Sequence, residues 1–200
     1  MPLIVQFTAG ADHRCASELE ALVRSALLNH PFLSITVKLP AHLQVNVAIC
    51  REQSTAIRFD TYPTHGDVTL TIFEFHLFKI KDGGSVIALD DAPLDDRLIN
   101  LLFHEFGHFI DARLDASFGY KDSLHPDDPR VKGFVDDLWN ASIDGRLKDK
   151  APHTLAERQS DAQEEGGIPA DAIARAWEGE WRTYPDLVRV AESLRSTNDQ

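Results

Sequence analysis

Hydrophobic and polar positions alternate along the first ninety residues of the chain, which is the pattern of strands. Val68, Leu70 and Ile72 alternate with threonines, as expected for a strand with one buried face. A helix that Asp12 can cap is predicted to run to about Asn29, with an apolar stripe along one side. The predicted strands are Leu3–Phe7, Ile35–Leu39, Leu43–Ile49, Ala56–Asp60, Val68–Ile80 and Ser85–Leu89.

From Asp95 onward the apolar positions recur every three to four residues, which indicates helices. The predicted helices are Asp95 or Asp96 to about Leu114, Val131–Lys148, Leu155–Glu165, Pro169–Trp177 and Pro185–Ser196. Strands followed by helices predict an α+β fold with an N-terminal mixed sheet. We expect one domain over residues 1–200, with a sheet-rich lobe at about 1–90 and a helical lobe at about 95–200.

Net charge, the first residues and the cysteines indicate which binding partners and which cellular compartment to expect. The formal net charge of −12 argues against nucleic acid and against an anionic membrane, because both require clustered Lys and Arg. The first seven residues form a short apolar stretch without a basic region, so they predict a strand, not a signal peptide, and a cytoplasmic protein. The two cysteines, Cys15 and Cys50, form no metal-binding pair in sequence and are expected to be reduced.

His104, Glu105 and His108 form an H-E-x-x-H pattern inside the most apolar predicted helix. At about 100° per residue the two histidines lie one turn apart on one face, where both can bind one metal ion. Glu105 lies at the rim of that face, within reach of a water on the metal. Because apolar residues cover the rest of the helix, these three polar side chains need a partner that offsets their burial. A bound Zn²⁺ is the expected partner.

A catalytic zinc ion takes three protein ligands and keeps one position for water. Asp144 is the first of two main candidates for the third ligand, because Asn140 and Asp144 share one face of a later helix and Ala141 leaves room beside them. The main apolar stripe of that helix points elsewhere, so a solvated polar face is the other interpretation.

Two other segments offer a third ligand. Glu157 and Asp161 have the spacing of a metal ligand and a residue that orients a histidine, but the charged residues around them make an exposed charged helix the stronger interpretation. His125, in a loop with two prolines, is a more distant candidate.

The motif resembles that of the zincin superfamily of metallopeptidases. In zincins a sheet precedes the motif helix, its edge strand binds extended substrate, and a later helix often supplies the third ligand. The Glu157–Asp161 spacing is similar to the glutamate helix of gluzincins, and Trp139–Asp144 is similar to the W-N-x-x-x-D segment of small bacterial metallopeptidases. The metzincin extension is absent, because Asp111 and Leu114 stand where its Gly and His belong, and the aspzincin G-T-x-D-x-x-Y-G segment is absent too.

These residues predict a zinc-dependent hydrolase that acts on peptide or protein substrates. Zn²⁺ on His104, His108 and Asp144 would activate a water, with Glu105 as the general base. Candidate donors to the substrate carbonyl are Arg113, Arg146 and Tyr120. Candidate edge strands for an extended peptide are Ala56–Asp60 and Val68–Ile80. The alternative is a non-catalytic zinc-binding or regulatory domain that retains the motif.

Overall fold

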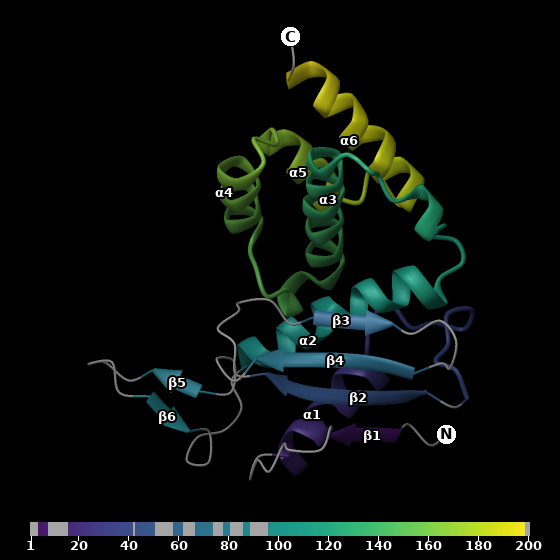
Figure 1. Ribbon diagram of the computed structural model, residues 1–200, viewed down its shortest axis with the longest axis vertical. Helices are drawn as coiled ribbons and strands as arrows, with labels where there is room; N and C mark the ends of the chain where they lie inside the picture. The colour runs from purple at the N-terminus through teal and green to yellow at the C-terminus, as the bar shows by residue number, and fades with distance from the viewer. Residues whose placement is uncertain are drawn as a thin grey trace. The chain divides into compact units, whose positions relative to one another are not determined.

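The protein divides into two compact units, Met1–Phe109 and Ile110–Gln200. The computed structural model describes residues 4–7, 16–41, 43–50, 58–61, 67–73, 78–80, 86–88 and 96–198. The division falls within the motif helix region, after Phe109, so the motif belongs with the strands and not with the later helices. Strands and two helices make up the described part of the first unit, and helices make up that of the second (Figure 1).

The first unit contains a four-stranded sheet in the order β1-β2-β4-β3. Its strands are β1 (Ile4–Phe7), β2 (Gln44–Cys50), β3 (Arg58–Thr61) and β4 (Asp67–Phe73). β1, β2 and β4 are parallel, whereas β3 runs antiparallel to β4, with Phe59 opposite Leu70. Among the described strands β3 is therefore an edge and β4 is internal. Two further strands, β5 (Phe78–Ile80) and β6 (Val86–Ala88), form a separate antiparallel ribbon.

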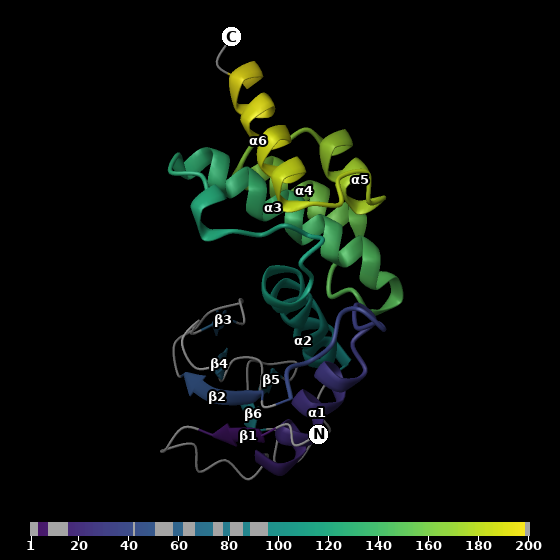
Figure 2. The ribbon, with the colours of Figure 1, turned by 90° about the vertical axis from the view of Figure 1, so that its right-hand side faces the viewer.

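Two helices, α1 (Ala16–Leu28) and α2 (Asp96–Phe109), lie on the same face of this sheet (Figure 2). The predicted apolar stripe of α1 is confirmed, since its four buried members have no exposed surface: Leu19, Val23, Ala26 and Leu27. α1 packs against β1 and α2, and α2 packs against β3. The helix that carries the motif therefore lies beside the antiparallel edge strand.

The strand predicted at Ile35–Leu39 is wrong, because local hydrogen bonds bend the chain there. The Ser34 hydroxyl accepts the backbone N–H groups of Thr36 and Val37, at 3.2 and 3.0 Å, and the Ser34 N–H donates to the Val37 carbonyl. Serine side chains compete with sheet pairing in this way. Ile35 is 89% exposed as a result. Asp12, Cys15 and residues 74–77 of the predicted strand Val68–Ile80 lie outside the described residues.

In the second unit, α3 is the central helix and packs against α4, α5 and α6. The helices are α3 (Pro129–Leu147), α4 (Leu155–Glu165), α5 (Ala170–Trp177) and α6 (Tyr184–Asn198). These bounds agree with the sequence prediction to within a few residues. Asp128 begins α3 by accepting the Arg130 N–H at 2.8 Å, and this bond lowers the pKa of its carboxyl. A π-helical turn, Ile110–Leu114, continues directly from α2.

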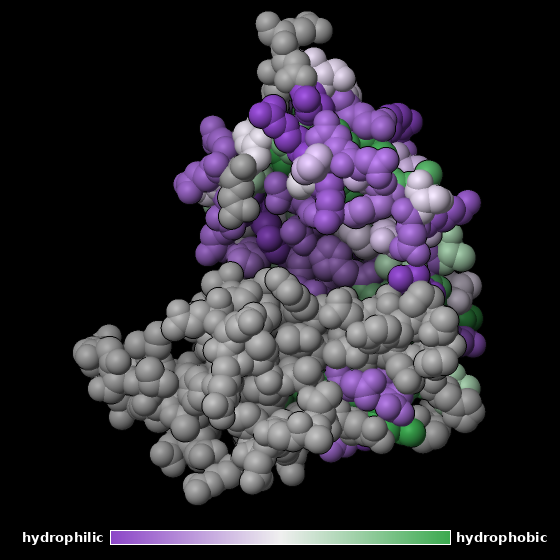
Figure 3. Space-filling model, in the orientation of Figure 1, coloured by the Kyte–Doolittle hydropathy of each residue, from purple (hydrophilic) through white to green (hydrophobic). Residues whose placement is uncertain are grey.

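The apolar side chains of the second unit are gathered in its interior. Val135, Leu138, Ile143 and Ile173 have no exposed surface. The described face of this unit in Figure 3 is correspondingly mostly hydrophilic, with few hydrophobic residues. Over the described ranges, none of the helices combines the length and the apolarity that a membrane crossing requires.

Candidate metal centre

The imidazoles of His104 and His108 face each other from successive turns of α2. Their Nε2 atoms are 3.2 Å apart, and the rings meet edge to face, with centroids 4.9 Å apart. In a tetrahedral zinc site with Zn–N bonds of about 2.05 Å, two nitrogen ligands are separated by about 3.3 Å. The two nitrogens therefore have the separation that one edge of such a site requires.

The same separation also suits a hydrogen bond in which one neutral imidazole donates its N–H to the other. His104 is 4% exposed, and the neighbouring Leu102 and Phe106 have no exposed surface. A cation and a shared proton would each engage Nε2 of both rings, so burial does not separate the two possibilities. The two imidazoles have the chemistry and the spacing that Zn²⁺ requires of two of its ligands.

Glu105 follows His104 on α2 and is partly buried. At about 100° per residue its carboxylate starts from a neighbouring strip of the helix surface, not from the strip that carries the two imidazoles. This position suits a group that works beside a metal ion without binding it.

His30 is a buried residue of this unit whose role the sequence did not reveal. Its Nε2 lies 2.7 Å from the carbonyl oxygen of Phe103, and its Nδ1 accepts the Phe32 N–H at 3.1 Å. Because Nδ1 accepts, Nε2 carries the proton and donates to Phe103. His30 therefore ties the end of α1 to α2 at the residue before His104. The contact joins residues 73 apart in sequence, so no local pattern could have shown it.

Asp144 lies on α3 in the second unit, and its side chain has no exposed surface. The Arg158 Nε from α4 donates to its Oδ2 at 2.6 Å. The interpretation of Asp144 as part of a solvated polar face is therefore wrong. Asn140, one turn earlier, is only partly buried. The apolar stripe shows only one packed face of α3. It does not show that α4 also packs against α3 and covers Asp144.

Glu157 has a structural role at the start of α4. Its carboxylate accepts the Thr154 N–H at 2.7 Å and the Thr154 hydroxyl at 2.9 Å, while Thr154 accepts the Glu157 N–H. This is a capping box, which satisfies backbone groups at the helix start. Glu157 and Asp161 are both exposed, so the interpretation of α4 as an exposed charged helix is confirmed for this pair.

Two of the candidate carbonyl donors are engaged within the second unit. Arg146 binds both oxygens of the buried Asp111, which also accepts the Trp139 Nε1–H at 3.0 Å. Arg113 lies over the ring of Tyr120, with its Cζ 5.9 Å from the ring centroid. Its Nη1 is 3.9 Å from Oδ2 of Asp122.

Tyr120 and His125 belong to an aromatic cluster around Tyr184. The Tyr184 ring contacts Tyr120 and Trp139, with centroids 4.7 and 5.4 Å apart, and its hydroxyl lies 2.7 Å from Nδ1 of His125. Burial, together with the nearby Asp122, raises the pKa of Tyr120, and burial raises the pKa of Tyr184 further above its ordinary value. The cluster holds both hydroxyls in their neutral, hydrogen-bonding form.

The structure brings together His104, Glu105 and His108 on one helix of the first unit. Asp144, Glu157 and His125 belong to the second unit. Within the described residues, no group of three or more His, Cys, Asp or Glu side chains is gathered closely enough to hold a metal ion. The zinc ion and its third ligand therefore stay predictions.

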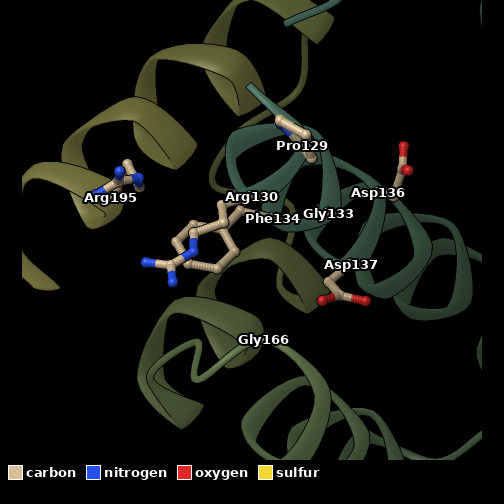
Figure 4. Close-up of a pocket in the computed structure, with 8 residues that line it drawn as sticks. All are labelled: Pro129, Arg130, Gly133, Phe134, Asp136, Asp137, Gly166 and Arg195. Carbon is tan, nitrogen blue, oxygen red and sulfur yellow. The ribbon is translucent and has the colours of Figure 1, made fainter. Parts of the chain in front are cut away.

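A hollow of about 690 Å³ opens in the second unit. Arg130 and Phe134 of α3 line it together with Arg195 of α6, and Gly133 and Gly166 leave its wall without side chains (Figure 4). None of its lining residues is one that the sequence predicted for the site.

Comparisons of the chain with protein-family models, with curated proteins and with solved structures find no match. The resemblance to zincins is therefore carried by the motif residues and their helix alone.

Proposed function

We propose that the protein is a zinc-dependent metallopeptidase in which His104 and His108 bind the metal and Glu105 acts as general base. The observation that carries the proposal is the pair of Nε2 atoms 3.2 Å apart on a buried apolar helix, with Glu105 beside them. Asp144, the third ligand predicted from the sequence, belongs to the other compact unit, so the proposal rests on the two imidazoles and Glu105.

Each residue has a defined chemical task in this proposal. His104 and His108 act as neutral imidazoles, because only the unprotonated Nε2 can bind a metal ion. Zn²⁺ supplies a Lewis acid for the substrate carbonyl and lowers the pKa of a water toward about 7. Glu105 accepts the proton of the attacking water and later donates it to the leaving amine nitrogen.

The edge strand β3 supports a peptide as the substrate. It is antiparallel to β4, it is an edge among the described strands, and α2 packs against it. An extended peptide can pair with such an edge through backbone hydrogen bonds, which do not depend on the side chains of the peptide. Of the two predicted edge strands, β3 keeps this role. The assignment of Val68–Ile80 as an edge is wrong for its β4 part, which pairs with β2 and β3.

The decisive experiment compares Glu105→Gln with His104→Ala. Glu105→Gln should retain stoichiometric zinc and lose peptidase activity by about 10²- to 10⁴-fold, because only the proton acceptor is removed. His104→Ala should lose zinc and activity together. Zinc is measured by elemental analysis after dialysis, and activity by cleavage of a mixture of quenched fluorescent peptides. Glu192→Gln, an exposed glutamate of α6, is the matched control and should change neither.

Two results contradict the proposal. Unchanged peptidase activity in Glu105→Gln with zinc bound removes Glu105 from the mechanism. Bound zinc in a wild-type protein that cleaves no peptide favours the non-catalytic alternative, a zinc-binding or regulatory domain that retains the motif. Unfolding on chelation, with no exchangeable water on the metal, would show that the zinc is structural.

A further inference from the structure

Another hollow of the second unit, of about 510 Å³, is lined by residues from the ends of α3 and α5. Ser142 and Arg146 of α3 line it together with Lys148, the residue that ends this helix. Arg182 lines it from the segment that follows α5. All of its lining residues belong to the unit Ile110–Gln200, so the hollow is a feature of this unit alone.

Ser142 is the residue of this hollow that indicates a ligand. It is 3% exposed, yet it lines the hollow. The Arg146 Nε donates to its backbone carbonyl at 3.3 Å, but none of the hydrogen bonds in the described part of the chain involves its hydroxyl. Buried hydroxyl groups normally have a hydrogen-bond partner, because a bond that is not made is costly. A group in the hollow that accepts a hydrogen bond would provide this partner.

Two cationic side chains of the same hollow, Lys148 and Arg182, form no ion pair with the described residues. Both are exposed. The Arg182 Nε donates to the Gly179 carbonyl at 3.1 Å, and both Nη groups are left for a ligand. Arg146, in contrast, already binds both oxygens of Asp111. The donors available in the hollow are therefore one ammonium group, one edge of a guanidinium group and one hydroxyl group.

The two cations alone would not indicate a ligand. Basic residues are favourable at the end of any helix, where they interact with the last carbonyl groups, and α3 and α5 end at Leu147 and Trp177. This explanation provides no acceptor for the Ser142 hydroxyl, whereas an anion does. Charged acceptors also form the stronger hydrogen bonds with such donors.

Two carboxylates line the hollow as well, and they oppose an anion to different extents. Asp115 accepts the N–H and the hydroxyl of Ser117, so its charge is engaged within its own loop. Glu178 is exposed and forms no ion pair with the described residues. Glu178 is therefore expected to weaken the binding of an anion, which makes it useful in a test.

We propose that this hollow binds the phosphate group of a small molecule, with Ser142, Lys148 and Arg182 as the donors. A phosphate group presents three acceptor oxygens, one for each of these donors, whereas a carboxylate presents two. The volume of about 510 Å³ lies within the range of small-molecule sites, about 300–1,000 Å³, so an organic part of the ligand also fits. The site takes either inorganic phosphate or a small phosphate monoester, and it does not depend on the proposed zinc chemistry.

The test is a calorimetric titration of the full chain at constant ionic strength. The probes are inorganic phosphate, glycerol 1-phosphate and acetate. Both phosphate compounds should bind saturably, and acetate should bind much more weakly. Tighter binding of glycerol 1-phosphate would identify a phosphate monoester as the ligand, and tighter binding of inorganic phosphate would identify the free ion.

Four variants should change phosphate affinity in two opposite directions. Ser142→Ala should weaken binding about tenfold or more, because a buried hydrogen bond to a charged group is lost. Lys148→Gln and Arg182→Gln should each weaken it about 2- to 5-fold, as expected for exposed charges. Glu178→Gln should strengthen it about 2- to 5-fold, because a like charge is removed. Arg130→Gln, at the hollow shown in Figure 4, is the matched control and should leave it unchanged.

Urea unfolding of each phosphate-free variant separates a role in binding from a role in folding. Ser142→Ala adds no volume and alanine favours a helix, so this variant should be at least as stable as the unchanged protein. If Lys148 and Arg182 serve only the helix ends, their variants lose stability and keep their full affinity for phosphate. That result would contradict the proposed role of the two cations.

Three further results overturn the proposal. Absence of saturable phosphate binding in the unchanged protein removes the site. Full affinity in Ser142→Ala, or an equal loss in Arg130→Gln, would show that phosphate binds to surface charges and not to this hollow. Acetate that binds as tightly as phosphate would show that the donors do not select a phosphate group. None of these results bears on zinc binding or on peptidase activity.

Discussion

At the scale of single residues, the partial burial of Asp136 on α3 should make the stability of the protein depend on pH. Asp136 is partly buried, and burial raises the pKa of its carboxyl, while Lys132 and His125 act in the opposite direction. A raised pKa means that the folded protein holds this proton more tightly than the unfolded chain does. Stability therefore falls as the pH rises above the ordinary value of 3.8, and the loss is complete above the folded pKa.

Asp136→Asn should stabilise the protein at neutral pH and leave its stability unchanged in acid. The amide keeps the shape of the side chain and removes the charge that folding disfavours. Urea unfolding of both proteins at pH 3 and pH 7 measures the effect. Asp149→Asn, which removes an exposed charge, is the control. An equal gain at both pH values would show that the effect is not due to ionisation.

Residues that act within one helix turn could be predicted from the sequence, and those that act across the fold could not. His104 and His108 are four positions apart, so helical geometry alone places them together. The bond of His30 to Phe103 joins the segment after α1 to α2, and that of Arg158 to Asp144 joins α4 to α3. Their partners depend on how helices pack, which the periodicity of one helix does not contain.

At the scale of elements, the contact between α3 and α5 is closer than side chains normally allow. A Cβ placed on Gly145 would lie 2.0 Å from the carbonyl oxygen of Trp177 and 2.7 Å from its carbonyl carbon. Both are backbone atoms at the end of α5, so they cannot rotate away. Gly145 therefore sets the distance between these helices, immediately after the buried Asp144.

Gly145→Ala and Gly133→Ala should have opposite effects although both lie on α3. The first should destabilise the protein by about 1–3 kcal/mol or more, because the helices must separate. The second should stabilise it by up to about 1 kcal/mol, because a Cβ there meets nothing within 4 Å and alanine favours the helix. Urea unfolding measures both. Equal effects at the two positions would show that helix propensity alone decides.

The errors in the predicted elements have local causes. Apolar alternation suggested a strand at Ile35–Leu39, but the Ser34 hydroxyl binds the backbone first. The alternation of apolar residues predicted that β4 is a strand. It did not predict which strands pair with β4, because strand order depends on pairing between distant segments. The helices after Asp95 were predicted well, since each helix satisfies its own backbone and shows a repeating apolar face.

At the scale of the whole molecule, zinc affinity and folding stability are linked in the proposed function. A ligand that binds only the folded chain stabilises it by about 2.7 kcal/mol at a concentration 100 times its Kd. For a chain of this size, each kcal/mol raises the melting temperature by about 2–4 °C. Because α2 belongs to the unit Met1–Phe109, the transition that unfolds this unit should respond.

Zinc at 100 times its Kd should therefore raise the melting temperature of the zinc-free protein by about 5–10 °C, and a chelator should reverse the rise. Scanning calorimetry measures the shift and separates transitions if the two units unfold independently. Glu105→Gln should keep the full shift, because Glu105 is not a ligand. His104→Ala should lose it, since one imidazole of the 3.2 Å pair is gone. A full shift in His104→Ala would place the zinc elsewhere on this acidic protein, and Mg²⁺ should give no shift because it prefers oxygen ligands.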